Sequence, residues 1–106
     1  MATSKDYMDF VLDQIKYDGM IRYKKMFGEY MIYLNDKPVL LVCDNTVFVK
    51  QKEALNSLLI NAEKGYPYEG SKEHYVLDIE DHHLTNQVLE IMDKITSIPK
   101  KKSKKV

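Results

Sequence analysis

The stretch that decides the fold reads IRYKKMFGEYMIYLNDKPVLLVCDNTVFVK and spans residues 21–50. Its β-branched and aromatic residues fall into four short runs, at residues 21–27, 30–34, 38–43 and 46–50. Gly28, Asn35-Asp36 and Asp44-Asn45 separate these runs and are typical of turns. Breaks this short join antiparallel neighbours, because a parallel crossover needs about a dozen residues or more. The stretch therefore predicts a four-stranded antiparallel meander.

Side-chain alternation sorts the apolar residues of these strands onto two faces of the predicted sheet. Tyr30 and Leu34 share one face, whereas Met31 and Tyr33 share the other. Phe48 is expected on the same face as Met31. Helices can cover one face, which leaves Met31, Tyr33 and Phe48 on the other. Because water is a poor neighbour for such a set, we expect a second subunit or another protein partner to cover it.

The flanking sequence predicts an α+β domain. Apolar residues at helical spacing predict three helices, over residues 4–17, 52–62 and 81–97. Gly19 is typical of the left-handed residue that closes a helix, here the first one. Residues 63–71 indicate a loop, and residues 74–78 a fifth strand at an edge of the meander. The expected order is α-β-β-β-β-α-β-α, with the helices packed on one antiparallel sheet.

Composition indicates one globular domain in the cytoplasm. The chain has 106 residues, of which 44% are hydrophobic and 30% charged, values that fit a single folded unit. Cys43 is the only cysteine, and with no secretory signal at the start this points to a reducing compartment. No apolar run approaches the roughly 20 residues of a membrane span, so no membrane contact is expected. We expect residues 1–98 to form the domain and residues 99–106 to be a disordered, lysine-rich tail.

The basic charges concentrate near the end of the chain. Five of the 16 basic residues are Lys100, Lys101, Lys102, Lys104 and Lys105. Residues 1–99 contain the other 11 basic residues and all 16 acidic ones, so their net charge is about −5. This acidic body argues against a domain-wide nucleic-acid footprint. The alternative is a weak nucleic-acid-binding module that uses Arg22, Lys24 and Lys25 together with the tail lysines. A charge-protected edge strand and a solvated tail explain the same residues.

The remaining polar motifs favour structural roles. His82-His83 are adjacent on the predicted helix and point about 100° apart, so they favour a polar helix start over a metal site. Cys43 ends the most apolar strand, where burial raises a thiol's pKa, and is interpreted as a packed core residue. Tyr66 and Tyr68 favour packing of their loop against the sheet. No cofactor, metal or catalytic set is expected, because no nucleophile–base or metal-ligand spacing stands out.

An ordered series of motifs carries a family resemblance. It consists of KMFGEY at 25–30, IY at 32–33, a hairpin at 36–37, LVCD at 41–44, FVK at 48–50, and then YEGSK and HYVLD within 68–78. Over about residues 4–96 this series resembles the N-terminal domain of the TfoX/Sxy family of competence regulators. Met31 and Gln51 depart from the family pattern, which often has Gly and Pro at these places.

The resemblance implies an α+β fold like that of type III secretion chaperones, which often dimerise. It also implies a role in bacterial transcriptional control as a co-activator-like factor rather than an enzyme, and it supplies no catalytic residues. We therefore expect a non-enzymatic regulator or adaptor that acts through protein–protein contact, including self-association as a homodimer.

Overall fold

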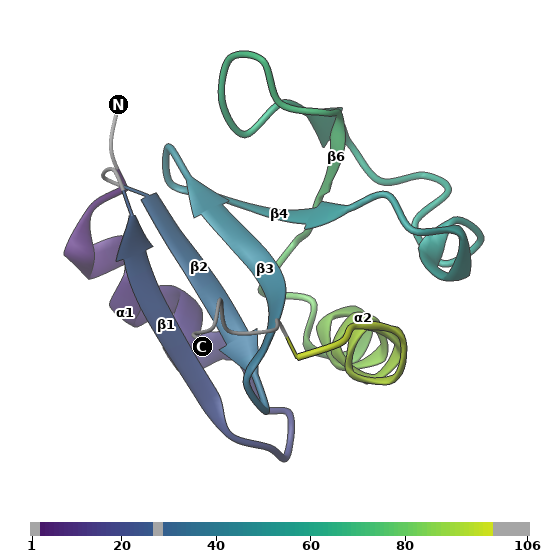
Figure 1. Ribbon diagram of the computed structural model, residues 1–106, viewed down its shortest axis with the longest axis horizontal. Coiled ribbons are helices and arrows are strands. Elements are labelled where there is room, and N and C mark those ends of the chain that lie inside the picture. The colour runs from purple at the N-terminus through teal and green to yellow at the C-terminus, as the bar shows by residue number, and fades with distance from the viewer. Residues whose placement is uncertain (1–2, 27–28, 99–106) are drawn as a thin grey trace, which may run out of the picture.

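A computed structural model describes residues 3–26 and 29–98 of the chain (Figure 1). The elements are α1 (Lys5–Gln14), β1 (Ile21–Met26), β2 (Glu29–Leu34), β3 (Lys37–Cys43), β4 (Thr46–Lys50), the short 3₁₀-helix η1 (Glu53–Leu55), β5 (Lys64–Gly65), β6 (His74–Val76) and α2 (His82–Ile95). The expectations for Phe27, Gly28 and the tail at 99–106 lie outside the described residues.

The predicted α+β class and the meander are confirmed. In the described part of the chain, six strands form an antiparallel sheet in the order β1-β2-β3-β4-β6-β5. The strand predicted at 74–78 forms at His74–Val76 and extends the sheet beyond β4. A two-residue strand, β5, lies inside the segment predicted to be a loop, so that prediction was wrong for Lys64–Gly65.

Two hairpins close through the turn residues that the sequence indicated. Asn35 and Asp36 have φ values of 52° and 67°, and Asp44 and Asn45 have 50° and 53°. Positive φ at both central residues is the signature of type I′ turns, whose twist matches that of the flanking strands. Asn and Asp tolerate this region better than other side chains do, because their short polar groups bond to nearby backbone.

The core lies between one face of the sheet and the helices. Figure 1 shows α1 behind β1 and β2, whereas α2 lies beside β3 toward the side of β4 and η1. Met8 and Val11 of α1 and Val88 and Leu89 of α2 are fully buried. They pack with the sheet face that carries the buried residues Tyr30, Ile32 and Leu34. The face predicted to be covered by helices is therefore the covered one.

Two details of the helical segments differ from the prediction. The helix expected over 52–62 is replaced by η1 and a series of turns. The first helix ends at Gln14 rather than near residue 17, so Gly19 does not close it. Gly19 instead allows a close approach to β2, since a Cβ there would lie 2.8 Å from Leu34 Cδ1.

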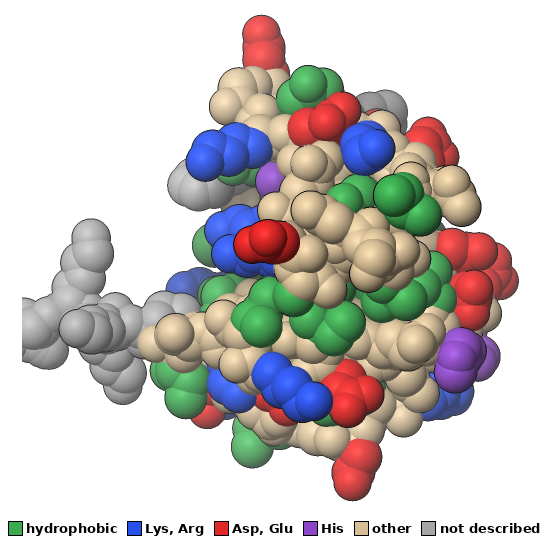
Figure 2. Space-filling model, turned by 90° about the vertical axis from the view of Figure 1, so that its right-hand side faces the viewer, with side chains coloured by type: hydrophobic (Ala, Val, Ile, Leu, Met, Phe, Trp, Pro, Cys, Tyr) green, Lys and Arg blue, Asp and Glu red, His purple; other side chains and the backbone are tan. Residues whose placement is uncertain are grey.

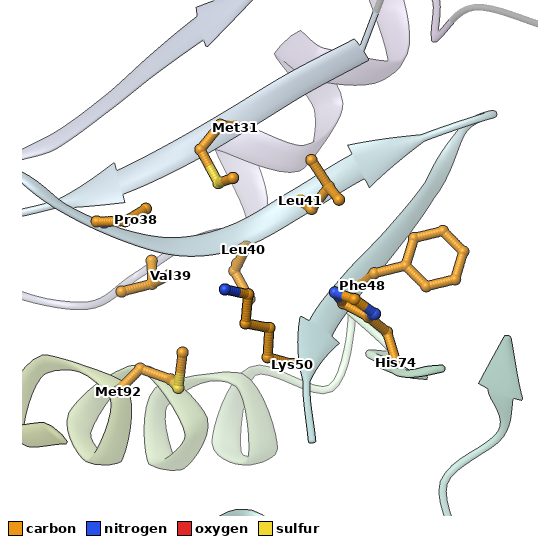
Figure 3. A pocket seen from close by; sticks show the side chains of 9 residues that line it. All are labelled: Met31, Pro38, Val39, Leu40, Leu41, Phe48, Lys50, His74 and Met92. Carbon is orange, nitrogen blue, oxygen red and sulfur yellow. The ribbon is translucent and has the colours of Figure 1, made fainter. Parts of the chain in front are cut away.

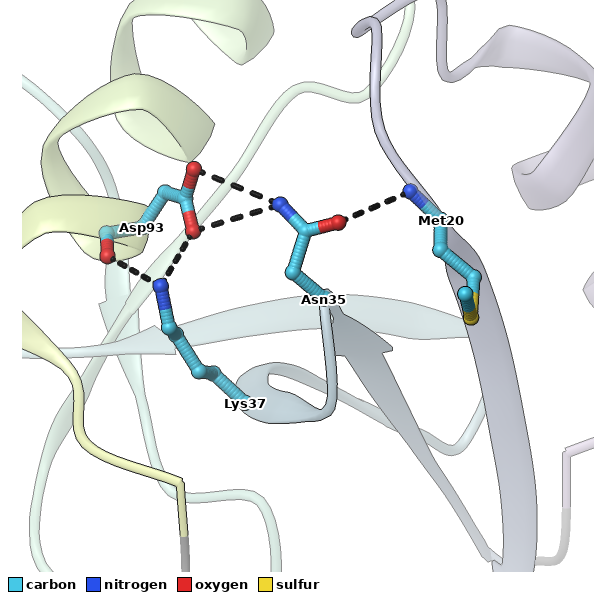
Figure 4. A network of polar contacts seen from close by, with 4 residues as sticks. All are labelled: Met20, Asn35, Lys37 and Asp93. Carbon is cyan, nitrogen blue, oxygen red and sulfur yellow. Dashed lines mark hydrogen bonds and ion pairs between the residues drawn. The ribbon is translucent and has the colours of Figure 1, made fainter.

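A polar network ties the β2–β3 hairpin to α2 (Figure 4). Lys37 Nζ donates to Asp93 Oδ1 at 2.7 Å and to the Asp93 backbone oxygen at 2.9 Å. Asn35 Nδ2 lies 3.4 Å from both carboxylate oxygens of Asp93, and Asn35 Oδ1 accepts from the Met20 amide at 3.0 Å. Hydrogen bonding from Lys37 lowers the pKa of Asp93 below its usual value. The network fixes the position of α2 relative to the sheet.

Candidate partner-binding cleft

An apolar row crosses the sheet on the face opposite the helices, which we call the outer face. Met31 of β2 pairs with Leu41 of β3, Leu41 pairs with Phe48 of β4, and Phe48 pairs with Val76 of β6. Directly paired residues project to the same side of a sheet. Met31 and Phe48 therefore share the outer face, as the alternation predicted, with Leu41 between them. Tyr33 follows on the same side of β2 and is half-buried, as is Met31.

A small pocket lies along this row (Figure 3). Its volume is about 100 Å³, and most of its lining is apolar. Ile32 pairs with Leu40 and Tyr33 with Pro38, so Val39 is an extra residue that forms a β-bulge. The bulge allows four successive residues of β3, from Pro38 to Leu41, to line the pocket. Met92 of α2 closes one side of it, and the Lys50 side chain extends from β4 across it toward β3.

His74 forms part of the pocket wall and is held in one orientation. Its side chain is buried, and its Nδ1 lies 2.7 Å from the backbone oxygen of Lys72. A carbonyl oxygen can only accept, so Nδ1 carries the hydrogen in this contact. The ring meets Phe48 edge to face, with 6.3 Å between centroids. His74 and Phe48 thus stabilise each other where β4 pairs with β6.

A wider cleft of about 760 Å³ opens beside the small pocket. The two cavities share Met31, Leu41, Lys50 and His74 in their lining. The other walls are the end of β4 and the segment 68–73, in which Gly70 has a φ of 87°. Positive φ suits glycine and lets this segment turn back toward β6. The shared lining makes the two cavities one continuous site.

Lysine side chains dominate the rim of the wide cleft. Lys50, Lys52 and Lys72 line it and are exposed. Glu73 is the acidic residue in the lining, and its carboxylate accepts from Gln51 Nε2 at 3.2 Å. The site therefore combines an apolar floor with a basic rim.

The structure gives the three predicted partner-binding residues different roles. Met31 lines both cavities, and Tyr33 lies further along the same strand face. Phe48 is only 7% exposed, because His74 and the β5 backbone cover it; a Cβ on Gly65 would be 3.4 Å from its ring. Phe48 is thus part of the floor rather than an exposed anchor. Sequence reasoning missed the lysine rim, although the alternation of Phe48 and Lys50 was a usable signal.

The basic residues of β1 do not form one strip. Arg22 pairs with Asp36, so its charge is compensated. Lys24 pairs with Met31 across the strands, whereas Lys25 pairs with Tyr30, which belongs to the covered face. The split between Lys24 and Lys25 follows the predicted alternation and separates the charges that a nucleic-acid strip would need together.

The other candidate groups have structural surroundings. Cys43 is fully buried, and this burial raises the pKa of its thiol to about 12, which confirms a packed core thiol. His82 Nε2 lies 2.7 Å from Gln14 Oε1 at the start of α2. Within residues 3–26 and 29–98, no group of three or more His, Cys, Asp or Glu side chains could hold a metal ion. Tyr66 and Tyr68 are 64% and 58% exposed, so the expectation that they pack on the sheet was wrong.

In the same described ranges, no helix is long and apolar enough to cross a membrane.

The fold defines a class: a small α+β domain in which helices back one face of an antiparallel sheet and a cleft occupies the other. The profile of the TfoX N-terminal domain matches residues 13–94, and the chain belongs to this family of regulatory domains, as the motif series predicted. The chain is also similar to an "uncharacterized 12.7 kDa protein in trpE 5'region" of Spirochaeta aurantia. The two are 40% identical over 78 residues, which cover 74% of this chain and 68% of the relative.

Proposed function

We propose that this protein is a non-enzymatic bacterial regulator of the cytoplasm that acts through protein–protein contact on the outer face of its sheet. The observation that supports the proposal is the Met31–Leu41–Phe48 row, which forms the floor of the cavity on the sheet face opposite α1. Membership of the TfoX N-terminal domain family, which is linked to the regulation of competence, supports a regulatory role. The buried free thiol of Cys43 supports a reducing compartment.

Self-association through the same face is a second form of this proposal. Half-buried Met31 and Tyr33 would then meet their counterparts in a second copy. A two-fold dimer brings the same patch of each chain together, so a single patch suffices. Light scattering at micromolar concentration distinguishes a homodimer from a monomer that binds another protein.

A second apolar area competes with the outer face as a contact surface. Hydrophobic side chains gather across the middle of the view in Figure 2, which faces the turns after η1 and α2. Ile60 in these turns is 70% exposed, and Ile95 of α2 is 44% exposed. Neither residue lines the small pocket or the wide cleft. We therefore favour the outer face and use Ile60 as the competing position in the test.

Photo-crosslinking in the producing bacterium tests the proposal. The photoreactive residue p-benzoylphenylalanine replaces Tyr33 on the outer face, Ile60 on the competing area, or Phe10 on α1. We expect a discrete protein adduct from position 33, whose mass identifies either a second copy or another protein. Adducts from position 60 alone, or the same adducts from all three positions, would contradict contact through the outer face.

A further inference from the structure

The small pocket has the size of one side chain. Its volume of about 100 Å³ is smaller than the roughly 150 Å³ of an apolar cavity that holds benzene. Met31, Leu41 and Met92 give it an apolar lining. Thioether side chains adapt their shape to what they contact. An aliphatic side chain therefore fits this pocket, whereas a whole cofactor does not.

The wide cleft is too open to enclose a small molecule by itself. Sites for small ligands bury about 70–90% of the ligand surface. This cleft instead opens to solvent between the end of β4 and the segment 68–73. A shallow cleft that continues from a side-chain-sized pocket suits a length of polypeptide, whose neighbouring side chains occupy the two parts at once.

The positive charges at the rim indicate that the bound polypeptide is acidic. Within the described ranges, Lys50, Lys52 and Lys72 form no ion pair, and the carboxylate of Glu73 is already bonded to Gln51. Elsewhere the body is acidic: α1, on the opposite face of the sheet, carries Asp6, Asp9 and Asp13. A local basic rim attracts an acidic segment to the cleft, whereas the aspartates of α1 disfavour its binding to that helix.

We propose that the cleft binds a short acidic segment of a partner protein, with one apolar side chain in the small pocket and carboxylates against Lys50, Lys52 and Lys72. This inference rests on the proposed function, because it names the chemistry of the partner at the same face. A nucleic acid fits less well, since it presents phosphates to the lysines but no aliphatic group to the pocket.

Fluorescence anisotropy with defined peptides tests the inference on the full chain. The probe is fluorescein-labelled Asp-Glu-Leu-Glu-Asp, compared with the same peptide carrying Ala for Leu and with Lys-Lys-Leu-Lys-Lys. We expect the Leu probe to bind up to about 50-fold more tightly than the Ala probe, because each of its three extra carbons contributes about fourfold when buried. We expect Lys50→Gln and Lys72→Gln each to weaken binding by about threefold, the scale of an exposed ion pair. Lys16→Gln removes a charge outside both cavities and should leave binding unchanged.

Amide chemical shifts locate the bound peptide. Shifts at Met31, Leu41 and His74 support the inference. It is overturned if the lysine peptide binds equally well, if the shifts map to α1, or if labelled oligothymidylate binds more tightly and loses affinity in the same lysine variants. Crosslinking from position 33 tests the partner contact on the outer face separately from the acidic chemistry of the partner. If the adduct persists in a Lys50→Gln/Lys72→Gln variant while the peptide does not bind, the partner contact stands and its acidic chemistry is wrong.

Discussion

Native Cys43 is expected to react with thiol reagents far more slowly than an exposed cysteine. Burial, and to a smaller degree the Glu29 carboxylate, raises the pKa of Cys43 to about 12. At about pH 8 an ordinary thiol with a pKa near 8.5 is roughly one-quarter thiolate. With a pKa of about 12, only roughly one ten-thousandth of the thiol is ionised, a loss of about two-thousandfold.

The higher nucleophilicity of the thiolate offsets part of this decrease in reaction rate. A more basic thiolate is intrinsically more nucleophilic, which gives back a factor of roughly 40 for this pKa difference. The chemical step is therefore expected to be about 50-fold to 100-fold slower than at an exposed cysteine. Complete burial of the side chain adds a steric barrier, because the reagent must wait for the protein to open.

The assay follows release of a coloured thiolate from an aromatic disulfide reagent, in native buffer and in concentrated urea. A Met20→Cys variant in a Cys43→Ala background supplies the matched control, since Met20 is 55% exposed. We expect the native protein to react at least 50-fold more slowly than this control, and at the same rate in urea. Equal rates in native buffer would refute both the burial argument and the exclusion of Cys43 as a nucleophile.

Three further predictions concern stability. Lys37 lowers the pKa of Asp93, so the stabilisation from this pair is present above the ordinary carboxyl pKa of about 4 and is lost as the pH falls through the lower folded-state pKa. The urea midpoint should therefore drop more steeply with acid in the native protein than in Asp93→Asn. Parallel curves for the two proteins would contradict this. Leu89→Ala empties a fully buried position of α2 and should cost about 3–5 kcal/mol in urea unfolding, whereas a loss below about 1 kcal/mol would show that the site collapses. Asp81→Ala removes the side chain that caps the Leu84 amide at 3.1 Å and should cost about 1 kcal/mol, with Asp81→Ser close to neutral.

The meander was predictable because its signals are local. Alternation fixes which side chains share a face, and Asn35-Asp36 and Asp44-Asn45 fix the turns through their own backbone preferences. The helix expected over 52–62 is replaced by η1 and turns, and one of its polar residues bonds to a distant strand. Asn56 accepts from the Tyr75 hydroxyl at 2.6 Å, a tertiary contact that spacing along the chain does not reveal. A helix of this length is marginal without tertiary packing, so packing decided the structure of the segment.

The cleft was not predictable from the same signals, because two distant segments build it. Lys50 and His74 become neighbours only when β6 pairs with β4, and the sequence did not indicate which edge of the meander the late strand joins. The loop that returns to β6 brings Lys72 and Tyr68 to the rim through the same pairing. Local alternation identified the floor, whereas long-range pairing of strands created the rim.

Coverage of Phe48 changes what kind of contact the outer face can make. A flat row of exposed apolar side chains would suit a broad interface, and a stable one buries about 1,200–2,000 Å² in total. Here His74 and the β5 backbone cover the Phe48 end of the row, while Met31 and Tyr33 stay half-buried at the other end. The open part of the row is therefore narrow, and lysines flank it. Such a site selects a short segment by its charge and one anchoring side chain, so the geometry favours an acidic segment over the broad contact that a second copy of the chain would need.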